Sequence, residues 1–143
     1  MIAVDTNILI YAHRAESPMH VPTKAALDRL AAGGLPWGTV WQCVHEFAAI
    51  VTHPRIYRPP STLDQCLEEI RNWRACPTFR CIAEGGAYWA NLEKLLVEGR
   101  VKRPLVHDAR IAAVCVEEGV REFWTVDRDF SRFPALPVVN PLR

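Results

Sequence analysis

The chain has 143 residues, of which 50% are hydrophobic and 23% charged, and these values predict one globular domain that buries a core. Its net charge of +1 gives no argument for a nucleic acid or a membrane as partner, although a local basic surface stays open. Five cysteines without a C-x-x-C pair argue against a disulfide framework or a zinc knuckle and predict a reducing, cytoplasmic location. The first residues resemble no signal peptide, and no stretch approaches the roughly 18 apolar residues of a membrane span.

Hydrophobic patterning predicts strands that alternate with helices along the chain. The predicted strands cover residues 2–5, 35–39, 78–83, 123–127 and 138–140. The first predicted helix has Thr6 or Asn7 as its N-cap, and a fourth begins with an S-x-x-D cap at Ser61. The other helices cover residues 23–32, 40–52, a segment around 88–99 and 108–119, and the proline-rich segment 52–61 is a loop. This alternation predicts an α/β fold with a central, mostly parallel sheet flanked by helices.

Acidic residues stand where the elements of this fold would meet. Ligands of parallel α/β folds lie outside the carboxyl ends of the strands, and Asp5 and Asp127 each close a predicted strand. Asp108 lies in the first turn of a helix whose preceding loop should reach the same edge. Glu46 is an isolated charge on an otherwise mostly apolar helix. Four acids from distant parts of the chain are therefore expected to converge, with Asp129 as a fifth candidate.

Each acid alone also has an ordinary structural explanation. An aspartate near a helix start or in a turn is common. If Glu46 is buried, it must meet a distant arginine, stay protonated or face a metal, because burying a lone charge is costly. Taken together, clustered carboxylates repel one another unless a cation lies among them, and oxygen ligands suit Mg²⁺ or Mn²⁺ better than zinc. The pattern therefore indicates metal-assisted hydrolysis of a phosphodiester.

Several fragments, in this order and spacing, resemble PIN-domain ribonucleases: "DTN" after the first strand, "HEF", "HDARIAA" and "TVDRDFSRFP". The fragments "NILIYAH", "VTHPRIY" and "NPL" extend the likeness over residues 1–143, more narrowly to VapC-type toxins of type II toxin–antitoxin (VapBC) systems. The resemblance implies a PIN-like fold in a single domain and a Mg²⁺-dependent endoribonuclease, with Mn²⁺ as an alternative metal. It also implies a tRNA or ribosomal RNA substrate, a homodimer and inhibition by a cognate antitoxin protein.

The resemblance also implies roles for individual residues. Four acids would be catalytic and would hold the metal, with a fifth as an additional metal ligand: Asp5, Glu46, Asp108, Asp127 and, fifth, Asp129. Three polar residues would support them: Thr6, Asn7 and Thr125. One departure is "KRPLVHD", where many relatives have Gly-Asn before the apolar pair, and it should alter the approach of RNA or antitoxin near Asp108.

Basic residues near the acids allow two interpretations each. Neighbouring helix residues point about 100° apart, so His45 and His107, each beside an acid, are expected to be structural. Four arginines could contact RNA phosphates: Arg55, Arg58, Arg110 and Arg128. The first two would otherwise belong to a solvated loop, and the last two could instead form ion pairs with the acids.

Two other functions remain open at this level. One is a catalytically silent module that binds RNA or protein and keeps the metal pocket, against which the complete set of acids argues. The other is a metal-dependent DNA nuclease or phosphatase with the same pocket.

Overall fold

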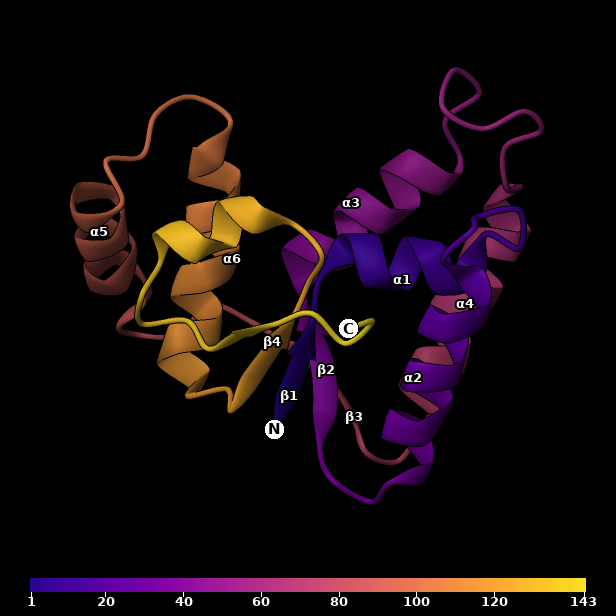
Figure 1. Ribbon diagram of the computed structural model, residues 1–143, viewed down its shortest axis with the longest axis horizontal. Helices are drawn as coiled ribbons and strands as arrows, with labels where there is room; N and C mark the ends of the chain where they lie inside the picture. The colour runs from indigo at the N-terminus through magenta and orange to yellow at the C-terminus, as the bar shows by residue number, and fades with distance from the viewer.

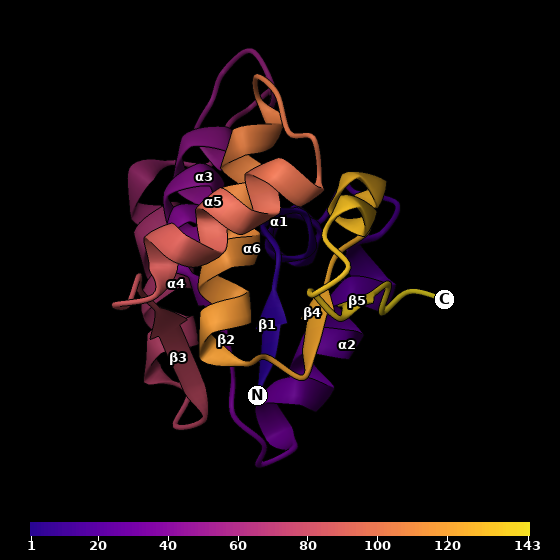
Figure 2. The same cartoon turned by 90° about the vertical axis from the view of Figure 1, so that its left-hand side faces the viewer.

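Five parallel strands form the centre of the computed structural model, which describes residues 1–143. The strands are β1 (Ile2–Val4), β2 (Trp37–Val40), β3 (Phe79–Ile82), β4 (Glu122–Trp124) and β5 (Val138–Val139). They lie in the order β3-β2-β1-β4-β5, and every neighbouring pair is parallel (Figures 1 and 2). The predicted parallel sheet is therefore confirmed, with β1 at its middle.

Six α-helices and a short 3₁₀ helix cover both faces of the sheet. They are α1 (Thr6–His13), α2 (His20–Ala32), α3 (Trp41–Val51), α4 (Leu63–Ala75), α5 (Tyr88–Glu98), α6 (Leu105–Glu118) and the 3₁₀ helix η1 (Arg128–Arg132). Figure 1 shows α5, α6 and η1 on one side of the sheet and α1, α2 and α4 on the other. None of these helices is long and apolar enough to cross a membrane.

Two apolar clusters hold the layers together, one on each face of the sheet. In β1 the Ala3 side chain joins the cluster under α5 and α6, and Ile2 and Val4 join the cluster under α1 to α4, as the alternation of side chains along a strand requires. Helix α6 has six buried residues and therefore packs into the core on more than one side. It stops at Gly119, whose φ of 67° is the left-handed conformation that glycine adopts at helix ends.

Some predicted helix ends are wrong. Asp5 caps α1 by accepting a hydrogen bond from the N–H of Thr6, so neither Thr6 nor Asn7 is the cap. Thr62 caps α4 in a capping box with Gln65, because the hydroxyl of Ser61 is engaged by His13 and an arginine instead.

The starts of α2 and α6 and the end of β4 also differ from prediction. Helix α2 begins at His20. Helix α6 begins at Leu105, directly after Pro104, whose φ of −64° suits the start of a helix. Strand β4 ends at Trp124, so Asp127 lies beyond the sheet rather than in its last strand position. The five cysteines are free, as predicted.

Candidate metal-binding active site

The predicted acids are brought to one edge of the sheet by four different elements. Asp5 follows the last residue of β1, and Asp127 lies three residues after the end of β4, the neighbouring parallel strand. Glu46 lies in the second turn of α3, which begins directly after β2, and Asp108 lies in the first turn of α6. Because parallel strands end at the same edge, these four carboxyl groups approach one another from segments far apart in the sequence.

One pocket of about 160 Å³ contains all four acids in its lining. The supporting residues Thr6 and Asn7 also line it, and its apolar wall consists of Ile10, Ile50 and Phe130. These three apolar residues are not predictable from the sequence, because nothing in a hydrophobic pattern distinguishes a pocket wall from a core position.

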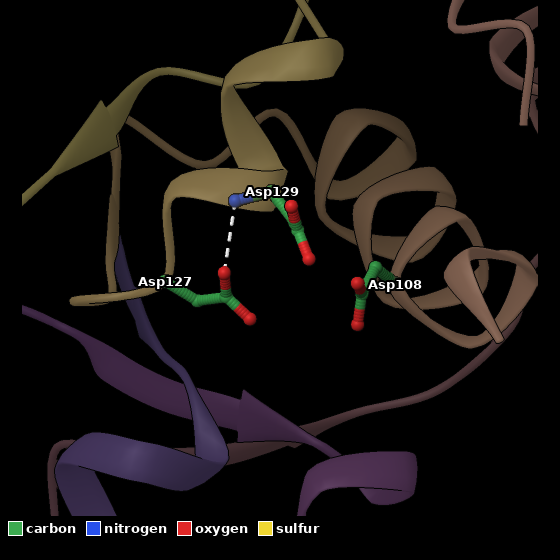
Figure 3. A group of neighbouring side chains, drawn as sticks. All are labelled: Asp108, Asp127 and Asp129. Carbon is green, nitrogen blue, oxygen red and sulfur yellow. Dashed lines mark hydrogen bonds between the residues drawn. The ribbon is translucent and has the colours of Figure 1, made fainter.

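A second group of acids overlaps the first. Carboxylate oxygens of Asp108, Asp127 and Asp129 lie within 4.8 Å of one another. Figure 3 shows the three side chains converging on a common space, Asp108 from α6, Asp127 from the cap of η1 and Asp129 from η1 itself. Asp129 itself lines a larger neighbouring pocket, and thus lies at the rim of the four-acid pocket rather than inside it.

Asp5 is the acid that the fold holds most firmly. Its side chain is buried, and its two oxygens accept three short hydrogen bonds. The N–H of Thr6 donates to Oδ1 at 2.7 Å, while Asn7 Nδ2 and Thr125 Oγ1 donate to Oδ2 at 2.7 and 2.6 Å. These donors fix the orientation of the carboxylate before any ligand arrives.

Thr125 links the ends of the two central strands. Besides donating to Asp5, its hydroxyl accepts hydrogen bonds from Asn7 Nδ2 and from the N–H of Asp127, each at 3.0 Å. A hydroxyl offers one donor and two acceptor positions, so all hydrogen-bonding positions of the Thr125 hydroxyl are occupied. The predicted supporting residues Thr6, Asn7 and Thr125 therefore all contact the acids or each other.

Glu46 differs from the buried charge considered at the sequence level. The residue is exposed, it forms no ion pair, and its Oε2 accepts a hydrogen bond from the hydroxyl of Thr6 at 2.6 Å. The cost of burying a lone charge therefore does not apply to it. Glu46 nevertheless lies in the pocket lining, because the outer face of α3 forms one wall of the pocket.

The position of Asp127 is compatible with both of the roles that the sequence left open. Its Oδ1 accepts a hydrogen bond from the N–H of Asp129 at 2.8 Å and caps η1, as a turn residue would (Figure 3). Its Oδ2 has no hydrogen bond in the structure and belongs to a side chain that lines the acidic pocket. A capping role is thus compatible with ligand binding.

The electrostatics of the pocket favour a bound cation. Burial raises the pKa of Asp5 to about 7, although the hydrogen bonds from Thr125 and Thr6 lower it, and the charges of Glu46 and Asp108 raise it further. Burial also raises the pKa of Asp108 to about 6, together with the nearby carboxylates of Asp127, Asp129 and Glu46. No arginine, lysine or histidine forms an ion pair with these acids. A set of oxygen donors that repel one another, with no protein cation among them, fits a divalent metal ion.

None of the predicted basic residues lines the four-acid pocket. The larger pocket, of about 500 Å³, is lined by Arg110 and by the two histidines next to acids, His45 and His107. Both histidines, which were predicted to be structural, are exposed. Arg110 forms no ion pair, which removes one of its two interpretations, and the same holds for the exposed Arg128.

The arginines of the loop after α3 lie apart from both pockets. Arg55 and Arg58 are exposed, and neither belongs to the lining of the acidic pocket or of the larger one. The guanidinium of Arg14 lies 4.3 Å from the ring centre of Tyr57 and covers one face of that ring. This loop therefore offers exposed cations and no contact with the acids.

Residues 2–136 match the family model described as the PIN domain, and the chain belongs to this family. It is 27% identical over 138 residues to ribonuclease VapC48 of Mycobacterium tuberculosis, covering 96% of this chain and 94% of that protein. It also shares its fold with the VapBC2 complex of Rickettsia felis bound to promoter DNA, at a TM-score of 0.70 and 19% identity over 98% of both chains. A third similar protein is VapC20 of M. tuberculosis, described as a sarcin–ricin loop cleaving toxin, with a TM-score of 0.67 and 18% identity over 92% of this chain and 93% of that one.

These similarities confirm the predicted single-domain PIN fold and the resemblance to VapC ribonucleases. The family match ends at residue 136, so the assignment of the whole range 1–143 to the domain stays a prediction.

Proposed function

We propose that this protein is a metal-dependent endoribonuclease and the toxin of a VapBC-type toxin–antitoxin pair. The observation that carries the proposal is the single pocket in which acids from four distant elements meet without a protein cation: Asp5, Glu46, Asp108 and Asp127. The membership in the PIN-domain family and the similarity to proteins named VapC ribonucleases support the same activity.

The four acids of the pocket are the proposed catalytic metal ligands, with Asp129 as an additional ligand at the rim. Mg²⁺ is the proposed ion and Mn²⁺ the alternative, since both prefer carboxylate oxygens. Such an ion, when bound, supplies positive charge beside the phosphodiester and makes a water molecule more acidic.

The remaining polar residues of the site position these ligands. Thr125 and Asn7 hold the Asp5 carboxylate in one orientation, and the hydroxyl of Thr6 holds that of Glu46. The backbone of η1 fixes Asp127 by its cap. Preorganised ligands of this kind need not reorganise when the substrate binds, which lowers the barrier of the reaction.

The relatives support a proposal for the substrate and the partners. We infer tRNA or ribosomal RNA as substrate, since one structural relative is described as cleaving the sarcin–ricin loop. Cleavage by activated water should leave 5′-phosphate and 3′-hydroxyl ends, since the 2′-hydroxyl is unused. Toxin–antitoxin complexes among the structural relatives support an inhibitory antitoxin partner. A homodimer and a location in the cytoplasm complete the proposal.

Cleavage of total RNA by the purified protein tests this function. We expect cleavage with Mg²⁺, none with a chelator, and none for Asp5→Asn or Glu46→Gln. Glu93→Gln is the matched control, because Glu93 is an exposed glutamate on α5 without an ion pair. Full Mg²⁺-dependent cleavage by Asp5→Asn would show that the assignment is wrong.

Assays of the same purified protein distinguish the alternative functions. A DNA oligonucleotide and a small phosphoester tested beside RNA distinguish a DNA nuclease or a phosphatase. Metal and RNA binding without turnover would indicate a silent binding module.

A further inference from the structure

A larger pocket lies next to the acidic one and shares two of its residues. This α3–α6 pocket has a volume of about 500 Å³, and Glu46 and Asp108 belong to both linings. Helix α3 contributes one wall and the first two turns of α6 the other, with Asp129 at one end. A chain that binds at the acids can therefore continue directly into this space.

The two pockets differ in what they can hold. The acidic pocket of about 160 Å³ corresponds to the volume of about five water molecules, at roughly 30 Å³ each, which suits an ion and a phosphate group. The α3–α6 pocket lies within the roughly 300–1,000 Å³ of small-ligand sites, so it has room for a nucleotide.

A polyanion at the acids needs positive charge beside it. The lining of the α3–α6 pocket includes one arginine, Arg110, and no lysine. Arg110 is half-buried and forms no ion pair and no side-chain hydrogen bond in the structure, although Asp108 and Asp129 line the same pocket. Its planar guanidinium is always charged and can bind a phosphate with two parallel hydrogen bonds. A free arginine in this position has the chemistry of a phosphate contact.

His45 supplies an aromatic surface in the same pocket. The residue is exposed, and its ring stacks on that of Trp41, one turn earlier on α3, at 6.3 Å between centroids and 27° between planes. Because Trp41 supports one face, the ring is held in place while the residue lines the pocket. Unpaired RNA bases are bound by stacking on such rings.

We propose that the α3–α6 pocket is a subsite for the nucleotide next to the scissile phosphodiester. Arg110 binds its phosphate and His45 stacks on its base. This inference rests on the proposed function, because it takes RNA as the ligand of the acidic pocket. Both residues bind the substrate and take no part in bond cleavage.

RNA affinity as a function of salt concentration tests the role of Arg110. The probe is a fluorescent short RNA of random sequence, and every variant carries Asp5→Asn so that the probe stays intact. We expect Arg110→Ala to weaken binding and to flatten the plot of log affinity against log salt by about 0.7, the value for one lost phosphate contact on a single strand. Arg71→Ala, which removes an exposed and unpaired arginine on α4, is the control and should change neither.

The role of His45 has a different signature. Stacking carries no charge, so His45→Ala should weaken binding roughly tenfold with an unchanged salt slope, and His45→Phe should restore most of the affinity. In the protein that retains Asp5 and can cleave RNA, Arg110→Ala and His45→Ala should each raise KM more than they lower kcat. Arg110→Gln replaces Arg110→Ala if the latter fails to fold.

The outcomes separate this inference from the proposed function. If Arg110→Ala and His45→Ala bind the RNA probe as Arg71→Ala does, the subsite is wrong even when the unmodified protein cleaves RNA. If the variants show the expected losses but the unmodified protein cleaves no RNA, the subsite stands and the proposed activity is wrong.

Discussion

The hydroxyl of Thr125 donates a 2.6 Å hydrogen bond to the carboxylate of Asp5, across 120 positions of the sequence. Asp5 follows β1, and Thr125 follows β4, its parallel neighbour. The bond can therefore form only after these strands pair, so the orientation of the most buried acid depends on the assembled sheet.

Removal of this hydroxyl should destabilise the protein. Thr125→Val leaves Asp5 without one donor, and leaves Asn7 and the N–H of Asp127 without their shared acceptor. We expect a loss of about 1–3 kcal/mol in the free energy of unfolding, measured with urea. Because the lost bond lowers the pKa of Asp5, the loss should be larger at pH 8 than at pH 5. Thr125→Ser keeps the hydroxyl and should stay close to the wild type; equal stability of all three proteins would contradict the role of this bond.

Stability without metal should fall as pH rises, because of Asp5. Its carboxyl has a pKa of about 7 in the folded protein and an ordinary value of 3.8, so the folded state binds more protons between these values. The contribution of Asp5 is thus fully favourable below pH 3.8, is lost as pH rises toward 7, and is absent above it, an effect of about 4 kcal/mol at 1.36 kcal/mol per pKa unit.

Asp5→Asn isolates this contribution. The amide cannot ionise, so the stability of the variant relative to the wild type should increase from pH 5 to pH 7 and then level off, in urea unfolding with a chelator present. The absolute difference also contains an unfavourable term, because four donors surround Asp5 and an amide nitrogen would face at least one of them. A difference independent of pH would contradict the raised pKa.

Divalent metal should reverse the penalty that the clustered acids impose. A ligand that binds only the folded state stabilises it, and here it competes with protons on Asp5 and Asp108, whose pKa values are about 7 and about 6. We expect Mg²⁺ to raise the Tm of the wild type more at pH 8 than at pH 5.5, and to raise that of Asp108→Asn less. Glu93→Gln should respond as the wild type does. A rise that Asp108→Asn shares in full would place the ion elsewhere.

The close pairing of β2 and β3 predicts a strong effect at Gly38. A Cβ atom there would lie 1.9 Å from the backbone oxygen of Arg80 on β3, and backbone cannot rotate out of the way as a side chain would. We expect Gly38→Ala to reduce the free energy of unfolding by roughly 1–3 kcal/mol or more. Gly86→Ala, with no atom within 4 Å of the added carbon, should change it by less than about 0.5 kcal/mol, and similar values for the two variants would contradict the pairing.

The site was partly accessible from the sequence, for reasons that differ between residues. Asp5 interrupts an apolar run at a predicted strand end, and the position of a strand end determines the sheet edge at which a residue emerges. Glu46 is an isolated charge on a mostly apolar helix, but it is exposed, so the cost of burying a lone charge does not explain its place in the lining of the acidic pocket. The angle between neighbours on a helix predicts that His45 and His107 point away from the adjacent acids, but it says nothing of the surface between α3 and α6, where both residues line the larger pocket.

The sequence alone determined the alternation of strands and helices, the parallel sheet and the acids expected at its edge, because periodicity and strand ends are local properties of the chain. Only the tertiary structure decided which hydroxyl holds Asp5, which acids share a pocket and whether Arg110 is paired. These depend on contacts such as that of Thr125 with Asp5 and that of Thr6 with Glu46, which form between segments that no local pattern relates.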